Sequence, residues 1–559
     1  MNANQYFATN ELGNIPRSRF DRSSSVKTSF NVGQLIPFYI DEVLPADTHD
    51  ITTSLVARLQ TLITPPMSDL YLDMYYFYVP TRLCWDHWRE FNGESHSAWT
   101  SDTTYSVPQV TFDMNEISSL SGTLADYFGL PTLNKSNIEQ PKYTVSRLPF
   151  NAYGKIWNDF FRDENLYDEL FIDTTDRNIN AGRDTQDIAS MKPLPVAKMH
   201  DYFTSCLPSP QKGRDVELGN LFDGIPVASS NRFQWDILAN PGFQSAGLRV
   251  YDRDTNKLMP TANLATTSDG LMKGTGGATG TYKGVVSIDG LTTDTSIVRD
   301  DGTKFWTSFT VNSLRLAIAT QQLLEKDARG GSRYAEILYN HFGVTAPDAS
   351  LQRPELLSAS RTRINVNQVA QTSGEIGTPL ASTGAYSLTN DSGHSFVKSF
   401  TEHGFIIGVA CLRYPHTYEQ GISRMWSRKD RLDFYYPVLA NIGEQPVYTG
   451  EIYAGRGTQD FTEVFGYQEA WADYRYKPSY VTGEMRADNE ISLAQWHFGD
   501  FYSEMPILSK EWIAEDKTPV DRALVVTSDV SNQCFMDCFI DNKTTRAMPV
   551  RSIPGLNRI

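Results

Sequence analysis

The sequence contains few cysteines, and their spacing does not predict a disulfide framework. Five occur in 559 residues, at positions 84, 206, 411, 534 and 538. An odd number cannot pair completely, and Cys534 and Cys538 would lie about 13 Å apart in a strand, too far for a disulfide. A single CxxxC spacing is also a weak signal for a metal site. We therefore expect buried, reduced thiols and assembly in a cytoplasm.

The chain also lacks targeting and membrane-spanning segments. Its opening residues, MNANQYFATNELG, have neither a basic n-region nor an apolar h-region. No stretch reaches the roughly 18 consecutive apolar residues that a membrane helix needs. We expect a protein made inside a cell that neither enters a membrane nor is exported.

Catalytic and cofactor-binding motifs are missing as well. GTGGATG at 274–280 has Thr279 where a dinucleotide loop needs its third glycine, and no P-loop lysine follows. DRDTNK at 252–257 opens like a calcium loop, but Lys257 replaces the turn glycine and Asn263 the closing glutamate. HExxH and GxSxG do not occur, and the nine histidines are scattered. The sequence therefore predicts no enzyme, cofactor or metal, although a glycosidase-like carboxylate pair stays an open alternative.

Negative charge exceeds positive charge over the chain as a whole, but not near its two ends. The formal charge of −16 argues against a protein that simply coats nucleic acid. Both terminal segments are basic, which suits a shell whose inner side meets phosphate, although solvated terminal charge would give the same pattern. The residues expected to contact nucleic acid are Arg17, Arg19, Arg22, Lys543, Arg546 and Arg551.

Aromatic residues, in contrast, are abundant: 10 Trp, 28 Tyr and 29 Phe. The segment DLYLDMYYFYVPTRLCWDHW at 69–88 is the clearest example. Residues 71–79 fit a strand buried on both faces that stops at Pro80, and Trp85 and Trp88 follow at helical spacing. So many aromatics in a chain without catalytic motifs indicate a structural building block, with Tyr and Trp available for interfaces.

Hydrophobic periodicity predicts strands separated by helices. An apolar stripe with helical spacing runs through 153–161, and two further helices at 312–328 and 332–342 meet across Gly330 and Gly331. Ser332 is expected to cap the second of these. The strands are expected at 34–44, 51–63, 70–79, 403–413, 432–439 and 522–530.

Composition divides the chain into three parts. Residues 1–30 are polar and read as an N-terminal arm without a core of its own. Residues 214–309 contain a Gly/Thr-rich stretch at 266–284 and read as an insertion with a loop tip. The apolar residues around the tip, such as Trp235, argue against the alternative of a disordered linker. The remainder, 31–213 and 310–559, is expected to form the main domain.

RMWSRKDR at 424–431 combines cations with an aromatic ring. A tryptophan that stacks on bases among arginines that pair with phosphates would suit single-stranded DNA. The same residues would equally suit a contact between subunits, in which the tryptophan packs and the arginines meet acidic neighbours. The residues concerned are Arg424, Trp426, Arg428, Lys429 and Arg431.

These motifs together resemble the major capsid proteins of microviruses, small icosahedral single-stranded-DNA bacteriophages, and specifically those of the gokushovirus branch. The resemblance lies in long blocks that occur in family order. Besides 69–88 they are NDFFRDENLYDE (158–169), DYFTSCLPSPQKG (201–213), EKDARGGSRYAEILYNHFGVTAPDASLQRPE (325–355), FTEHGFIIGV (400–409), RMWSRKDRLDFYYP (424–437), GEQPVYTGEIY (443–453), FGYQEAWADYRYKPS (465–479) and MPVRSIPGL (548–556).

The resemblance implies a mainly β protein: an antiparallel jelly roll, the viral β-barrel capsid fold, with large loop and α-helical insertions. It implies a T=1 icosahedral shell of about 60 copies around a circular single-stranded DNA genome. The implied partners are further copies of itself, an internal scaffolding protein, a DNA pilot protein, a small basic DNA-binding protein and a host surface receptor.

The resemblance also implies that the protein is part of the virion and assembles in the host bacterial cytoplasm. The insertion corresponds to a protrusion at the threefold axes, where its tip would help host attachment. The tip residues are Thr275, Thr279, Tyr282 and Lys283. An alternative from another class is a carbohydrate-binding or carbohydrate-active β-sandwich, against which the missing export signal counts.

Overall fold

The structure is a computed structural model in which the chain forms two compact units. Unit 1 comprises residues 1–212 and 324–559, and unit 2 comprises residues 213–323. The residues that the structure describes are 16–94, 105–113, 117, 119–132, 142–213, 216, 264–266, 272–274, 311–331, 333–370, 372, 383–455 and 462–551.

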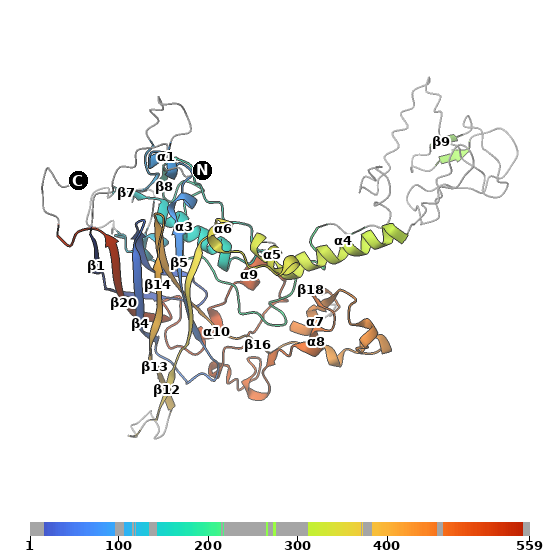
Figure 1. Ribbon diagram of the computed structural model, residues 1–559. Helices are drawn as coiled ribbons and strands as arrows, with labels where there is room; N and C mark the ends of the chain where they lie inside the picture. The colour runs from blue at the N-terminus through green and yellow to red at the C-terminus, as the bar shows by residue number, and fades with distance from the viewer. Residues whose placement is uncertain are drawn as a thin grey trace. The chain divides into compact units, whose positions relative to one another are not determined.

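Two antiparallel sheets form the centre of unit 1 (Figure 1). One has five strands in the order β1-β20-β4-β14, with β2 pairing with β20 as well. The other has the order β11-β5-β15-β3. The five-stranded sheet contains β1 (Arg17–Asp21), β2 (Ser24–Phe30), β4 (Thr48–Leu59), β14 (Thr389–Ser399) and β20 (Cys534–Ala547), and the four-stranded sheet contains β3 (Ile36–Val43), β5 (Tyr71–Pro80), β11 (Glu355–Arg363) and β15 (Gly404–Arg413).

The path of the chain between these sheets is that of a jelly roll. Successive strands β2, β3, β4 and β5 alternate between the two sheets, and β11, β14, β15 and β20 alternate again. Strands that are distant in sequence thereby become neighbours, as two interleaved Greek keys require. The structure confirms the expected mainly β, antiparallel jelly-roll fold.

The main core lies between the two sheets. Every second residue of β4 and β20 is buried, which places one face of the five-stranded sheet in the core and the other in solvent. Gly408 on β15 lets aromatic rings pack against the backbone, because a Cβ there would lie 2.8 Å from Phe38 and 3.0 Å from Tyr76. The two sheets contribute Phe30, Ile51, Leu55, Leu72, Met74, Ile406, Leu412, Met536 and Ile540 to this cluster.

The second face of the four-stranded sheet is also covered. Phe77 and Val79 of β5 belong to a second apolar cluster with Trp85 and residues of α3 (Leu148–Ile156). A π-helical turn, Trp157–Phe161, continues α3, and Phe160 and Phe161 contact Phe77. The prediction that residues 71–79 form a strand buried on both faces is confirmed, as is the helix at 153–161.

Most other elements lie in two long connections, one from β5 to β11 and one from β15 to β20. In the first, α4 (Val311–Gly330) continues from unit 2 into unit 1. The remaining elements are η2 (Thr81–Leu83), α1 (Trp88–Phe91), β6 (Gln109–Asp113), α2 (Leu124–Tyr127), β7 (Lys142–Ser146), β8 (Ile179–Asn180), β9 (Leu264–Thr266), β10 (Met272–Gly274), α5 (Tyr334–Phe342), α6 (Asp348–Leu351), β12 (Val366–Ala370), β13 (Thr383–Ser387), β16 (Thr417–Tyr418), η5 (Arg424–Trp426), η6 (Arg431–Asp433), η7 (Pro437–Leu439), β17 (Glu444–Tyr448), α7 (Thr449–Ile452), β18 (Val464–Glu469), α8 (Ala472–Arg475), β19 (Ser479–Tyr480), η8 (Gly483–Met485), η9 (Ala494–Trp496), α9 (Lys510–Ile513) and α10 (Thr518–Asp521).

Three local predictions need correction. The second half of the arm expected at residues 1–30 belongs to the five-stranded sheet, because β1 and β2 both pair with β20. The strand expected at 432–439 consists instead of the short 3-10 turns η6 and η7. The strand expected at 522–530 is a series of turns, and the actual strand, β20, follows it.

The five cysteines are buried and unpaired, as expected. Burial raises the pKa of Cys534 to about 12 and, together with the charge of Asp537, that of Cys538 to about 12. These thiols therefore stay protonated and unreactive at neutral pH.

None of the described helices is long and apolar enough to cross a membrane.

Candidate functional site

The two basic segments predicted to contact nucleic acid form one antiparallel ladder. The register of β1 on β20 places Ser18 opposite Arg546 and Asp21 opposite Lys543. Residues more than 500 positions apart in sequence thus lie side by side at one edge of the five-stranded sheet. Arg551 is exposed and lies just beyond β20.

Three of these basic residues have exposed, weak contacts. Arg19 pairs with Asp50 at 3.0 Å, and Lys543 pairs with Asp541 at 3.0 Å. Arg17 donates to the carbonyl of Ala46. Exposed ion pairs contribute about 0–1 kcal/mol, so a phosphate can replace the carboxylate at little cost.

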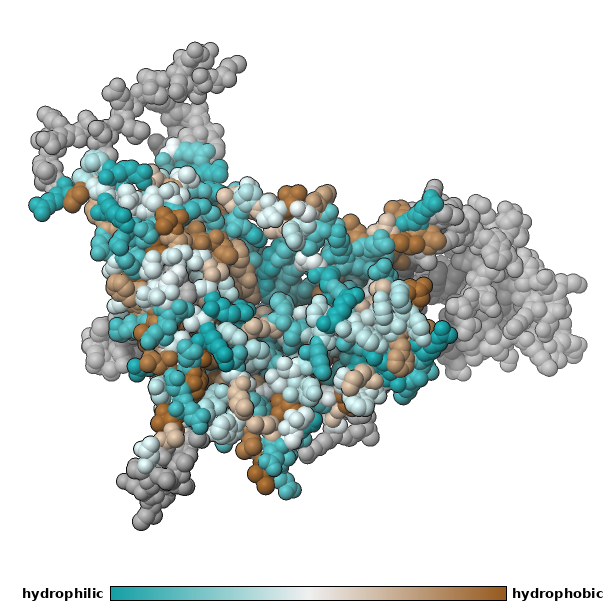
Figure 2. Space-filling view, turned by 60° about the horizontal axis from the view of Figure 1, so that its bottom comes forward, coloured by the Kyte–Doolittle hydropathy of each residue, from teal (hydrophilic) through white to brown (hydrophobic). Residues whose placement is uncertain are grey.

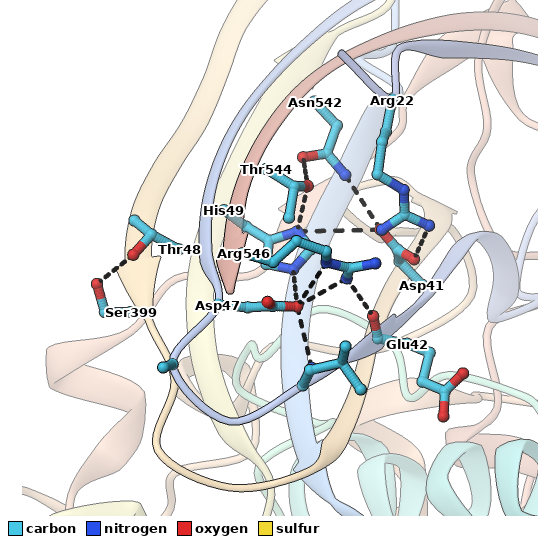
Figure 3. Close-up of polar contacts among 12 residues, drawn as sticks. Arg22, Asp41, Glu42, Asp47, Thr48, His49, Ser399, Asn542, Thr544 and Arg546 are labelled. Atoms are coloured by element: carbon cyan, nitrogen blue, oxygen red, sulfur yellow. Dashed lines mark hydrogen bonds and ion pairs between the residues drawn. The ribbon is translucent and has the colours of Figure 1, made fainter. Parts of the chain in front are cut away.

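Arg22 and Arg546 are engaged within the protein. Arg22 donates two hydrogen bonds to Asp41, at 2.6 and 2.7 Å, and Arg546 donates two to Asp47, at 2.7 and 3.1 Å (Figure 3). Asp41 and Asp47 are buried. These arginines therefore neutralise carboxylates of the β3–β4 turn region, which makes them less available to an external phosphate.

His49 lies inside the same network. Its Nδ1 is 3.9 Å from Asp41, and its Nε2 is 3.7 Å from Asp47 (Figure 3). Burial lowers the pKa of His49, an effect that the two carboxylates only partly oppose. Asn542 and Thr544 of β20 complete the network through hydrogen bonds. The sequence could have indicated that His49 is buried, because side chains alternate between the two faces of a strand and His49 lies two residues before the core residue Ile51.

The structure separates the residues of RMWSRKDR into two groups. Arg428 forms an ion pair with Asp473 and lies 4.2 Å from the ring centre of Tyr474. Arg424 donates to the carbonyl of Pro446 at 2.9 Å. The arginines of this first group are thus held by their own chain. The second group, Trp426, Lys429 and Arg431, is exposed, and Trp426 is 74% accessible.

An unusual number of apolar side chains around this segment is exposed. Figure 2 shows hydrophobic residues, in brown, scattered among hydrophilic ones on the face that it draws. Residues 422–442, which we call the 422–442 surface, form only 3-10 turns and loops. Their exposed apolar side chains are Ile422, Met425, Trp426, Leu432, Phe434, Tyr435, Val438 and Ile442. Apolar patches of this kind mark contacts with other proteins.

Unit 1 also contains a hollow of about 470 Å³ between α3, the start of α5 and the residues before β11. Its lining includes Lys155, Asp159 and Arg333. Burial raises the pKa of Asp159, an effect that the nearby cations oppose. Arg333 donates to the carbonyls of Asn158 and Arg162, so it ties α5 to the end of α3. This wall is therefore held together by structural contacts.

Several predicted positions lie outside the described residues. These are the attachment-tip residues Thr275, Thr279, Tyr282 and Lys283, the motifs at 252–257 and 275–280, and the apolar residues around the tip. Where the structure does describe the chain, no three His, Cys, Asp or Glu side chains are grouped to hold a metal ion.

A jelly roll with long connections and an exposed apolar surface is consistent with a class, the β-barrel proteins of viral shells. Comparison with known proteins is in agreement. The model of a family described as "Capsid protein (F protein)" matches residues 9–556. Capsid protein VP1 of Chlamydia phage 1 is 37% identical, covering 98% of this chain and 96% of the relative.

Two further relatives are equally similar. Capsid protein VP1 of Bdellovibrio phage phiMH2K is 37% identical over 96% of this chain and 95% of its own length. Capsid protein VP1 of Spiroplasma virus 4 is 37% identical over 98% and 96%. The chain belongs to the phage capsid protein (F protein) family, and it is a bacteriophage capsid protein with a structural role.

Proposed function

We propose that about 60 copies of this chain assemble into a T=1 icosahedral shell that encloses a circular single-stranded DNA genome. The observation that carries this proposal is the 422–442 surface. Trp426, Leu432 and Val438 are 74%, 72% and 87% exposed, which a free monomer would have to present to water. Contacts repeated around a closed shell would bury such side chains and multiply weak affinities.

Helix α5 supports the same proposal. Its Tyr334, Tyr339 and Phe342 are 66%, 63% and 73% exposed. Tyrosine and phenylalanine are enriched in protein interfaces, so this helix offers a second contact to neighbouring copies. Membership of a capsid family favours a structural role over the carbohydrate-active β-sandwich that the sequence left open.

The test is shell formation by a variant of the 422–442 surface. Leu432→Glu/Val438→Glu places two charges where a neighbour would pack, and we expect it to stay folded and form no shells in electron micrographs. Val530→Glu is the matched control, because Val530 is 80% exposed and lies outside this surface. Shells formed by the double variant at the wild-type yield would contradict the proposal.

The resemblance supports further partners: an internal scaffolding protein during assembly, and a DNA pilot protein and a small basic DNA-binding protein in the virion. Assembly would take place in the host bacterial cytoplasm. The insertion at 214–309 would contribute to host attachment through its tip, since loop tips vary without disturbing a scaffold. Replacing residues 268–282 by a Gly-Ser linker should preserve particles and reduce adsorption to cells. Loss of particles would instead make the segment a structural interface.

A further inference from the structure

The side of the five-stranded sheet that faces away from the core is largely polar. We call it the outer sheet face, and it consists of the residues of β1, β2, β4, β14 and β20 that alternate with the buried ones. Serine and threonine hydroxyls are frequent on it, among them Thr52 and Ser54 on β4. The exposed valines Val56 of β4 and Val397 of β14 also lie on this face. Among the described residues, two aromatic side chains interrupt its polar composition, both on the central strand β20.

These two side chains are Phe535 and Phe539, which are 40% and 51% exposed. They are four residues apart on one strand, so they project from the same face about 13 Å from each other. Phe535 lies opposite Arg58 of β4, and Phe539 lies opposite Ser54. In the part of the chain that the structure describes, neither ring contacts another aromatic ring. Both rings are therefore partly open to solvent in the middle of a sheet.

The charge of the outer sheet face differs from that of the whole chain. Its cations outnumber its carboxylates by one on β1, β2, β4 and β20, although the chain as a whole carries −16. Lys27 is 72% exposed and pairs with Asp537 at 3.2 Å. Arg58 is exposed and has no ion-pair partner among the described residues. A polyanion is thus tolerated here far better than on an average part of the surface.

We propose that the outer sheet face binds single-stranded DNA, with Phe535 and Phe539 as stacking positions for bases and with Arg58 and Lys27 as phosphate contacts. This inference rests on the proposed enclosure of a single-stranded DNA genome. Aromatic rings on an open sheet, flanked by cations, are a general means of holding unpaired bases. The hydroxyls of Thr52 and Ser54 can donate to phosphate or base oxygens between the rings.

The composition of the face favours DNA over another copy of the chain as its occupant. Cores of protein interfaces are depleted of serine, aspartate and lysine, and these residue types dominate here. The 422–442 surface has the opposite composition and is suited to contacts between copies. The weak exposed pair of Lys27 with Asp537 also allows phosphate to compete for the cation.

The test is a fluorescence-anisotropy titration of the full chain with two labelled probes of roughly 20 nucleotides. One probe is oligothymidine, and the other has the same backbone but no bases. Phe535→Leu/Phe539→Leu should bind the thymidine probe about tenfold more weakly and the abasic probe almost unchanged. Phe535→Tyr/Phe539→Tyr keeps the rings and should restore wild-type affinity. Phe501→Leu is the matched control, because Phe501 is 45% exposed and lies outside both this face and the proposed contacts between copies.

A second variant tests the phosphate contact. Arg58→Gln should weaken both probes alike and reduce the slope of log affinity against log salt by about one. An unchanged affinity of the double leucine variant for thymidine would overturn the stacking assignment. Failure of that variant to form shells, with DNA affinity unchanged, would identify the face as a contact between copies. The nucleic-acid content of wild-type particles tests the proposed genome enclosure separately. Wild-type particles that contain no DNA would refute that enclosure itself.

Discussion

Charged residues in this protein act mainly on their own fold. Arg22 and Arg546 hold the buried carboxylates Asp41 and Asp47, and only the more exposed cations stay open to a polyanion. A carboxylate without its partner in such a place retains the full cost of its desolvation. The sequence predicts that the basic residues of both ends contact the genome. At residue scale they have two roles: some hold buried carboxylates of the fold, and the more exposed ones stay open to a polyanion.

The Arg546–Asp47 pair provides a direct test of that separation. Arg546→Met leaves Asp47, which is fully buried, without its cation and should lower the free energy of unfolding by about 3–5 kcal/mol. Arg19→Met removes an exposed pair with Asp50 of β4 and should cost less than about 1 kcal/mol. Denaturant unfolding of the two purified variants measures both values. Equal losses would contradict the structural role of Arg546.

A second buried ionic group predicts a pH dependence. Nδ1 of His416 lies 2.9 Å from Asp500, and Nε2 lies 3.1 Å from Glu515, with Lys198 3.6 Å from Asp500. Burial alone would lower the pKa of His416, but the two carboxylates outweigh it and raise the pKa to about 9. The folded protein therefore holds this proton more tightly than the unfolded chain, whose histidine has a pKa near 6.5.

The sign of the effect follows from that difference. The stabilisation is complete below pH about 6.5 and is lost as the pH rises through about 9, with a total on the order of 3 kcal/mol. The unfolding free energy of the wild type should thus fall between pH 7 and 8, below the range in which the buried cysteines ionise in the unfolded chain. His416→Gln should abolish most of that slope. A wild-type curve that is flat over this range, or a variant with the same slope, would contradict the assignment.

At the scale of elements, the sequence predicts strands well where their residues fill the chain's own core. The expected strands at 34–44, 70–79 and 403–413 correspond to β3, β5 and β15. The strand predicted at 432–439 is wrong because its apolar residues lie in exposed turns, in which Pro437 begins η7. A local pattern cannot distinguish apolar residues that fill a core from those that stay exposed on the chain.

β20 is the opposite case, a strand that the sequence prediction missed. Its buried residues recur with period 2 from Cys534 to Ile540, a pattern that itself indicates a strand. The sequence prediction instead places the strand at 522–530, on a short Leu-Val-Val run just before it. The partners β1 and β2 come from the opposite end of the chain, and no local signal reveals such a pairing. The network of His49 with Asp41 and Asp47 is only partly predictable: the alternation in β4 indicates that His49 is buried, but the arginines that neutralise the two carboxylates come from opposite ends of the chain.

The placement of β1 and β2 in the sheet predicts the outcome of N-terminal truncation. Removing residues 1–30 takes away both strands and leaves an edge of β20 without its ladder, which favours aggregation. We expect this truncation to abolish soluble protein and particles, whereas removing residues 1–15 should retain folded protein. Solubility and circular dichroism of the two truncations measure this. If the protein without residues 1–30 is folded and soluble, the whole segment is a dispensable arm and this account of β1 and β2 is wrong.

At the scale of the whole molecule, the jelly roll serves as a rigid frame. The two sheets enclose one core, and the connections from β5 to β11 and from β15 to β20 carry most of the exposed aromatic and apolar side chains. Long connections are uncommon unless they have a function, and contact with neighbouring copies is a function that fits these side chains. Frame and contact surfaces are thus built from different stretches of the sequence.

The most direct test of the account is the mass of the assembled particle. The chain is expressed together with the internal scaffolding protein proposed above. The purified product is examined by mass measurement of intact particles and by electron microscopy. We predict closed particles with a protein mass of roughly 3.8 MDa, which corresponds to about 60 copies of a 62.9 kDa chain. Monomers or small open oligomers alone, under conditions where the chain is folded, would contradict the account.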